Sequence, residues 1–329
     1  MQHGLSRAAV RRGDTRQLSL ETHSYRLGGM RIGFAVPQSG PWATPGNMRR
    51  VATRAEELGY RELWTFQRLL YPVGHPMGPT YRSVHDPLIT LAHLSGVTGE
   101  IGLGVAVINA YVQPVVLAKQ LATLQTISGG RMTAGLGLGW LPEEFEAAGV
   151  GFERRGRRGE EFVELLRKVW ADDVVEHDGE FYRVPPSHVD PKPVPGPPPI
   201  LLGGTADVAL RRAARLADGW VSSSREDLSA IAGRVELIKR TLAESGRDAA
   251  GFRFVVRGVT QVRDGQVGDG AERRPLTGTF EEIRRDVDEL AAGGVTDVFH
   301  DLNFDREFVT LDAKDAMRRA EEALEALAP

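Results

Sequence analysis

The chain has 329 residues, of which 41% are hydrophobic and 26% are charged, and its formal net charge is −3. This length and composition suit a globular protein with a large buried core. The small negative charge argues against non-specific nucleic-acid binding, which usually needs a basic face. No apolar run approaches the roughly 18 residues of a membrane span. We therefore expect neither nucleic acid nor a membrane as a partner.

Cysteine is absent, which excludes disulfides, thiolate metal sites and cysteine nucleophiles. Its absence fits a reducing cytoplasm, where we expect the protein to reside. Residues 1–29 carry five arginines and no apolar run, so they do not resemble a secretory signal. We interpret them as a disordered extension or the product of a start codon placed too early, with a transit peptide as the alternative. The remaining residues, 30–329, are expected to form a single domain.

From Met30 onward, apolar runs alternate with segments of helical spacing. The runs predict strands over 30–37, 62–66, 101–109, 131–138, 199–204, 218–223, 252–262 and 296–302. The helical segments lie near 47–58, after Asp86-Pro87, from Pro114 to Gly129, and over 142–148, 156–170, 206–216, 228–242, 279–290 and 315–327. Asn47 is the expected cap of the first helix, and Thr279 with Glu282 predicts a capping box. Residues 174–184 indicate a small hairpin, and the proline-rich stretch 185–199 an extended arm.

Eight strands with intervening helices predict an α/β fold, a (β/α)₈ TIM barrel with insertions. Several strands are continuous apolar runs, as is typical of parallel strands that are covered on both faces. The competing architecture is an open, doubly wound sheet. That fold favours a glycine fingerprint after the first strand, whereas PQSGPWATPGN follows here.

The segment 131–150 places three alternating glycines, Gly135, Gly137 and Gly139, at the end of a strand. Trp140 follows them directly. The spacing is GxGxG rather than the GxGxxG of dinucleotide-binding sites. Glycines at a strand end remove side chains where another body approaches the backbone closely. We interpret the segment as a strand end beneath a flat ligand, with a loop and a helix folding over it.

A second glycine motif follows the fifth predicted barrel strand. In a barrel of this type, function lies at the C-terminal ends of the strands. Gly203, Gly204 and Thr205 precede a helix there, so their backbone N–H groups and the helix dipole favour an anion, most often phosphate. The alternative is an ordinary turn in which Thr205 is the N-cap.

Several kinds of chemistry are disfavoured by the pattern. None of the five lysines falls at a predicted strand end, which argues against a Schiff-base enzyme. The eight histidines show neither HxH nor HExxH spacing, so we expect no metal site. No GxSxG motif and no P-loop occur. An apolar barrel mouth with tryptophan and an anion site suits a flat phosphorylated cofactor instead.

The chain resembles the bacterial luciferase-like superfamily, and within it the actinobacterial branch of enzymes that depend on the deazaflavin F420. The motifs that carry the resemblance are RIGFAVP, ELWTFQRLLYP, IGLGVAVIN, PVVLAKQLATLQTISGGRMTAGLGLGW, RGRRGEEFVELLRKVW, PPILLGG and TFEEIRRDVDELAAGGVTDVF. The resemblance covers residues 30–328. It implies a luciferase-like (β/α)₈ barrel, usually a homodimer, with F420 or the alternative FMN at the C-terminal mouth.

The resemblance also implies which residues hold that cofactor. A non-proline cis peptide supports the ring in this family, and the matching bond is Ala106–Val107. The strand end formed by Gly137, Leu138 and Gly139 is expected to line the cofactor. The phosphate-binding turn of the family matches Gly203, Gly204 and Thr205.

The chain departs from the family at the positions of its best-known acid and base. Gln67 and Arg68 stand where related dehydrogenases carry an acidic residue and a histidine, and Trp140 replaces a glutamate. Arg68 is not a base near neutral pH, but it is suited to bind a carboxylate or to stabilise the reduced ring. His300 ends the last strand, and strand alternation allows only His300 or its neighbour Asp301 to face the pocket. Further candidates for contact with a small-molecule substrate are Asn109, Tyr71 and His85.

The favoured hypothesis is an F420-dependent oxidoreductase that exchanges a hydride with a small organic substrate. The alternative is an FMN-dependent monooxygenase that uses O₂ and a separate reductase. A third hypothesis is a catalytically silent barrel that carries the cofactor. In each case the loops 67–85 and 263–278 are candidate lids.

Overall fold

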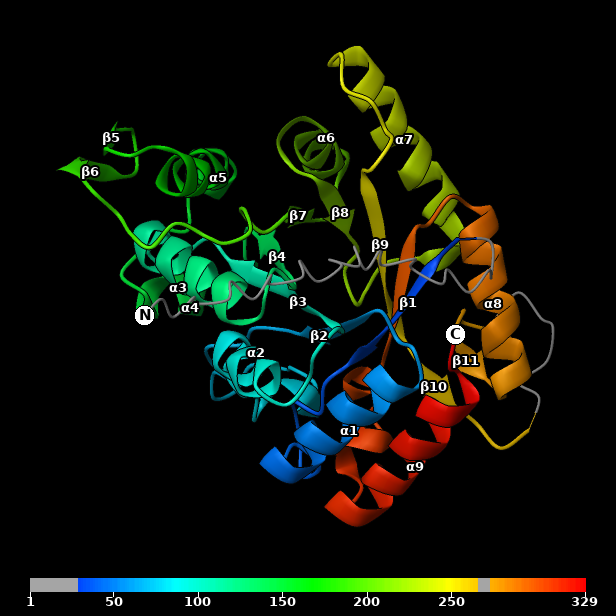
Figure 1. Ribbon diagram of the computed structural model, residues 1–329. Coiled ribbons are helices and arrows are strands. Elements are labelled where there is room, and N and C mark those ends of the chain that lie inside the picture. Colours follow the sequence, from blue (N-terminus) through cyan, green and yellow to red (C-terminus); the bar gives the residue numbers. More distant parts are fainter. Residues whose placement is uncertain (1–28, 266–272) are drawn as a thin grey trace, which may run out of the picture.

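The barrel predicted from the sequence is confirmed by a computed structural model, which describes residues 29–265 and 273–329. Parallel strands close in the order β1-β12-β9-β8-β7-β4-β3-β2, and helices surround them (Figure 1). Residues 1–28 of the expected extension lie outside the described residues, as do residues 266–272 of the second candidate lid.

Each barrel strand lies within its predicted range. The strands are β1 (Arg31–Ala35), β2 (Glu62–Thr65), β3 (Gly102–Asn109), β4 (Met132–Gly137), β7 (Ile200–Gly203), β8 (Gly219–Val221), β9 (Arg253–Val259) and β12 (Asp297–Asp301). Two short parallel strands, β10 (Gln261–Val262) and β11 (Thr277–Gly278), pair outside the barrel. The apolar runs predict the strands well because a parallel strand is buried on both of its faces.

The helices follow the strands as expected for a barrel. They are α1 (Pro45–Glu57), α2 (Pro87–Ser95), α3 (Pro114–Ile127), α4 (Pro142–Ala147), α5 (Arg155–Ala171), α6 (Asp207–Leu216), α7 (Ile231–Glu244), α8 (Phe280–Ala292) and α9 (Ala313–Ala326), with 3₁₀ turns at η1 (Pro79–Tyr81), η2 (Leu228–Ala230), η3 (Leu302–Phe304) and η4 (Phe308–Thr310). The last helix, α9, packs beside the first, α1, as Figure 1 shows.

The principal insertion lies between β4 and β7. It contains α4, α5 and the antiparallel hairpin of β5 (Val175–Asp178) and β6 (Arg183–Ser187), which stands beside α5 and away from the barrel (Figure 1). The hairpin prediction is confirmed. The predicted proline-rich arm begins later than expected, because Pro185 and Pro186 belong to β6.

The helix caps confirm one prediction and correct another. Thr279 and Glu282 form the predicted capping box of α8. The prediction that Asn47 caps α1 is wrong. The helix begins at Pro45, and the side chain of Thr44 accepts the Asn47 backbone N–H at 3.2 Å. Proline suits the first turn of a helix because its missing N–H has no partner there, and this shifts the start towards Thr44.

The middle of the barrel is filled by aromatic side chains. Trp64 stacks on Phe299 with 4.8 Å between ring centroids and an interplanar angle of 14°. Glycines let the indole lie against the backbone, since a Cβ atom at Gly104 would stand 2.6 Å from Trp64 and one at Gly33 would stand 2.9 Å from it. The barrel is therefore a packed core rather than a channel.

The N-terminal end of the barrel is closed by an ion-pair network. Arg253 on β9 contacts Glu62 at 2.5 Å and Asp297 at 2.6 Å, and it donates to Thr133 Oγ1 at 3.0 Å. All four side chains come from different barrel strands, and together they seal the end opposite the expected ligand site. Among the described helices, none is long and apolar enough to cross a membrane.

Candidate functional site

The floor of the barrel mouth, at the C-terminal ends of the strands, is built around Arg257. This residue lies on β9 and is 8% exposed. Its Nε donates to Asp301 Oδ2 at 2.8 Å, and its Nη1 donates to the Ala106 carbonyl at 3.1 Å. The guanidinium lies 4.5 Å from the ring centroid of Phe304 and 5.0 Å from that of Phe66. The site thus has a buried cation that is paired with one carboxylate and held by aromatic rings.

The backbone beside Arg257 has the feature implied by the family resemblance. The Ala106–Val107 peptide bond is cis, and the pairing of β3 with β4 is irregular between Val105 and Ile108. Val107 packs against the aliphatic and aromatic residues of the barrel interior. The carbonyl that Arg257 binds, that of Ala106, belongs to this cis bond.

A second ion pair lies at the rim of the mouth. Arg68 Nη1 lies 3.0 Å from Glu144 Oε1, and the two side chains are 5% and 1% exposed. The same carboxylate oxygen accepts the Leu69 backbone N–H at 2.7 Å. The Arg68 guanidinium lies over the rings of Tyr81 and Trp140, at 4.8 and 4.9 Å from their centroids. Arg68 and Trp140, both predicted site residues, are thus brought together.

Gln67 and Asn109, two further predicted residues, also meet at the rim. Gln67 Oε1 accepts the Asn109 backbone N–H at 2.9 Å, which ties the loop after β2 to the end of β3. Asn109 is 7% exposed. The pair therefore fixes the position of the β3 end, whereas contact of either side chain with a substrate stays a prediction.

The glycines at the end of β4, with Gly137 in the strand and Gly139 after it, lie close to other parts of the protein. A Cβ atom at Gly137 would stand 2.5 Å from Val107 and 2.8 Å from Asn109, and one at Gly139 would stand 2.6 Å from Phe145. Gly139 also has φ +74°, which favours glycine. These glycines make room for the protein's own side chains, and contact of Gly137, Leu138 and Gly139 with a cofactor stays a prediction. The neighbouring Leu138 reaches α5, since a Cβ atom at Gly159 would meet it at 2.3 Å.

The predicted anion site lies at the start of α6. Gly203 ends β7 and Gly204 follows it, both are partly exposed, and Gly204 has φ +138°. The alternative in which Thr205 caps the helix is wrong, because the N-cap is Ala206, which makes no side-chain cap. The first N–H groups of α6 therefore have no capping side chain, as a phosphate site requires.

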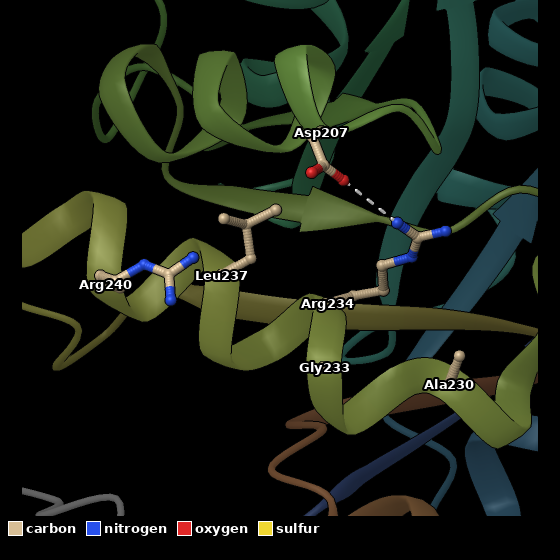
Figure 2. A pocket seen from close by; sticks show the side chains of 6 residues that line it. All are labelled: Asp207, Ala230, Gly233, Arg234, Leu237 and Arg240. Carbon is tan, nitrogen blue, oxygen red and sulfur yellow. Dashed lines mark hydrogen bonds and ion pairs between the residues drawn. The ribbon is translucent and has the colours of Figure 1, made fainter.

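A shallow depression adjoins this helix start. It has a volume of about 360 Å³ and lies between α6 and α7, lined by Asp207, Ala230, Gly233, Arg234, Leu237 and Arg240 (Figure 2). Arg234 Nη1 lies 3.4 Å from Asp207 Oδ1. This ion pair offsets the negative charge that Asp207 brings to the first turn of α6 and that would otherwise oppose an anion.

His300, predicted as a catalytic residue, does not face the mouth. Its neighbours Phe299 and Asp301 point into the barrel, so strand alternation turns His300 outward. The ring is 2% exposed, and its Nδ1 lies 3.0 Å from Thr260 Oγ1. Burial lowers the pKa of His300 to about 4, so it is neutral at pH 7. Asp301 is the residue of this pair that reaches the site.

Two predicted substrate residues are used in local structure. The ring of His85 bonds to the Ala43 carbonyl at 3.0 Å. Tyr71 donates its hydroxyl to the Met77 carbonyl at 2.9 Å, which closes the loop 67–85 on itself. Neither contact is at the floor of the mouth. Within the described parts of the chain, no group of three histidines and carboxylates is arranged to hold a metal ion.

Sequence reasoning missed Arg257, Glu144 and Tyr81. Arg257 did leave a signal, because Arg253 and Arg257 interrupt an apolar strand at positions that share one face. The contacts of Glu144 and Tyr81 left no signal in the sequence, because each contact forms only where loops from different strands meet at the rim.

Comparison with known proteins settles the family. The family model described as luciferase-like monooxygenase matches residues 29–289. This chain belongs to that family. An uncharacterised protein of Mycobacterium tuberculosis is 33% identical over 241 residues, which cover 67% of this chain and 82% of the relative. The FMNH(2)-dependent dimethylsulfone monooxygenase of Pseudomonas fluorescens is 29% identical over 211 residues, covering 63% of this chain and 56% of that protein.

Solved structures share the fold of this family member. The monooxygenase RslO1 from Streptomyces bottropensis has a TM-score of 0.72 and 22% identity, covering 91% of this chain and 98% of that one. An F420-dependent secondary alcohol dehydrogenase, in complex with an F420-acetone adduct, has a TM-score of 0.73 and 15% identity, covering 91% and 99%. At these identities the likeness shows a common barrel.

Proposed function

We propose that the chain is an F420-dependent oxidoreductase that exchanges a hydride between the deazaflavin and a small organic substrate. One observation carries the proposal: Glu144 and Asp301, two of the buried carboxylates at the mouth, are both paired with arginines. Such a pair fixes the carboxylate on its arginine instead of leaving it free to contact a substrate. The bound cofactor would supply the redox chemistry, and the protein would supply position, charge and exclusion of water.

The residues at the mouth fit such a cofactor. The uncapped start of α6, with Gly203 and Gly204, suits the phosphate. The bulge at Ala106 and Val107 offers an apolar surface for a flat ring. Arg257, beside this bulge, would stabilise negative charge on the reduced ring. The F420-dependent dehydrogenase with the same barrel supports the assignment.

A second candidate is an FMN-dependent monooxygenase that uses O₂ and receives reduced flavin from a separate reductase. It is favoured by the 29% identity to an FMNH(2)-dependent monooxygenase. The site features above suit either ring, since both cofactors carry a phosphate and gain negative charge on reduction. The cofactors must therefore be compared directly.

The test is titration of the purified full chain with F420 and with FMN, each oxidised and reduced, followed by absorbance and fluorescence. We expect micromolar F420 binding and reoxidation of reduced F420 in the presence of a substrate. Micromolar binding of FMN without binding of F420 would establish the second candidate instead. Binding of F420 without turnover across a substrate panel would indicate a catalytically silent carrier.

A matched pair of variants tests the phosphate assignment. Ala206→Asp places a carboxylate at the α6 N-cap, where it would bond the N–H groups itself and repel phosphate. We expect cofactor affinity to fall at least about tenfold while the helix gains about 1 kcal/mol. Ala313→Asp adds the same carboxylate to the first turn of α9, which packs against α1 and does not line this depression, and it should leave the affinity unchanged. Equal affinity in all three proteins contradicts the assignment.

Gly204 is unsuited to this test. A Cβ atom there would meet Ala209 at 2.5 Å, and the positive φ disfavours other residues, so a substitution would disturb the fold as well as the site. The homodimer implied by the resemblance stays a prediction, which light scattering of the purified chain tests.

A further inference from the structure

Trp140 differs from the other tryptophans of the chain. Four of the five, Trp42, Trp64, Trp170 and Trp220, are at most 6% exposed, whereas Trp140 is 41% exposed. It follows β4 at the rim of the barrel mouth. A large aromatic side chain that is exposed beside a candidate active site offers a stacking surface for a ligand.

Two guanidinium groups lie on this indole. Arg68 stands 4.9 Å and Arg225 stands 5.1 Å from the centroid of the Trp140 ring. Arg68 belongs to the loop after β2, and Arg225 belongs to the loop after β8. Loops from three separate strands thus converge on one side chain at the rim.

The two arginines differ in their charge balance. Arg68 is paired with Glu144 at 3.0 Å, and Arg257 on the floor is paired with Asp301. Arg225 is exposed, and within residues 29–265 and 273–329 no carboxylate lies in ion-pair contact with it. Among the residues that the structure describes, Arg225 therefore presents a positive charge without a carboxylate partner, and that charge lies against the exposed indole.

The loop that carries Arg225 is anchored. The Arg225 backbone N–H donates to Ser223 Oγ at 3.1 Å, and the Ser224 carbonyl accepts from Arg274 Nη2 at 2.9 Å. The next side chain, Glu226, is buried and bonds to Arg234 at 3.2 Å. Such anchoring reduces the ordering cost when Arg225 binds a ligand.

We propose that Trp140 and Arg225 recognise the substrate, and that the substrate is a flat organic carboxylate. Its ring would pack against the exposed part of the indole, and its carboxylate would pair with the Arg225 guanidinium in a charge-assisted hydrogen bond. The proposal deepens the proposed function, because a molecule held there lies at the mouth that the cofactor would occupy. The recognition itself requires no cofactor, so it is tested without one.

The experiment uses the cofactor-free full chain and two ring compounds that differ in charge, benzoate and benzamide. Acrylamide quenching of tryptophan fluorescence reports Trp140, because the other four indoles are buried. We expect benzoate to protect Trp140 at a concentration at least about tenfold lower than benzamide. Inorganic phosphate, which lacks a ring, should not protect it. Trp140→Phe should remove most of the quenchable signal.

Arg225→Gln should abolish the preference for benzoate. Arg183→Gln, which changes an exposed arginine on the distant hairpin, is the matched control and should keep the preference. Thermal melts of both variants establish that the fold is intact.

Three results would overturn the proposal: equal protection by benzoate and benzamide, an unchanged preference in Arg225→Gln, or protection by phosphate as strong as that by benzoate. A loss of F420 or FMN affinity in Arg225→Gln with the benzoate preference unchanged would assign Arg225 to the cofactor instead. Failure of the chain to bind either cofactor would refute the proposed function and leave this test unaffected.

Discussion

Both ends of the barrel contain an arginine of β9 that is paired with an aspartate of β12, but the surroundings of the two pairs differ. Arg253 and Arg257 are four residues apart on β9, and Asp297 and Asp301 are four residues apart on β12. At the N-terminal end, Arg253 has two carboxylates and a hydroxyl as partners. At the mouth, Arg257 has one carboxylate, a carbonyl and aromatic rings. The first arrangement closes the barrel, whereas the second holds a single arginine–carboxylate pair among the aromatic rings below the mouth.

The largest expected loss of stability comes from breaking the ion-pair network at the closed, N-terminal end. Arg253→Met would leave Glu62 buried without its cation and would leave Asp297 with only the partly exposed Arg31, so we expect the free energy of unfolding to fall by about 3–5 kcal/mol. Urea unfolding measures the loss. Arg31→Met is the control, because Arg31 contacts Asp297 at 2.7 Å but is 46% exposed, and its removal should cost less than about 1 kcal/mol. Equal losses in the two variants would show that burial does not determine how much each ion pair stabilises the fold.

The matching change at the mouth should affect activity more than stability. In Arg257→Gln, Asp301 keeps hydrogen bonds from the backbone and side chain of Asn303, both at 3.0 Å. We therefore expect a smaller loss of unfolding free energy than in Arg253→Met, together with a fall of about 100-fold in turnover of the reduced cofactor. Unchanged turnover would show that the guanidinium serves only to pack the floor.

The third prediction concerns His300, which lies on β12 between Phe299 and Asp301 but faces away from the barrel interior. Burial lowers its pKa to about 4 from the usual 6.5, so the unfolded chain binds the extra proton between these values. The stability that this residue supports is therefore full above pH 6.5, falls as the pH falls, and is lost below about pH 4. We expect His300→Gln to reduce the loss of unfolding free energy between pH 7 and pH 5 by about 2 kcal/mol. Parallel urea titrations at the two pH values measure it, and identical slopes contradict it.

The smallest expected effect concerns the hydroxyl partner at the closed end. Thr133→Val removes the hydrogen bond from Arg253, and we expect a loss of about 1 kcal/mol with no change in cofactor affinity. A change in affinity would show that the two ends communicate through the barrel interior.

The sequence predicted the barrel because its signals are local. Strand β4, for example, is an apolar run that begins after Gly129-Gly130, and its bounds need no knowledge of distant residues. The same holds for the capping box at Thr279, where donor and acceptor lie three positions apart. The cis bond at Ala106–Val107 came from resemblance to a family, not from a local rule.

The site was less predictable because its contacts are long-range. Arg257 and Asp301 are 44 positions apart, and only closure of the barrel brings them together. Strand alternation limited the last strand to His300 or Asp301, but the choice between them requires knowing which face points inward. The sequence correctly indicated that other atoms lie close to the backbone of Gly137 and Gly139. In the structure these atoms belong to the side chains of Val107 and Phe145.

The stacked pair of Trp64 and Phe299, with glycine backbone pressed against it, seals the barrel at mid-height. A barrel that is closed in this way is open to ligands only at its C-terminal mouth. Any ligand of the barrel must therefore enter and leave at the mouth, past the rim residues Arg68, Trp140 and Arg225.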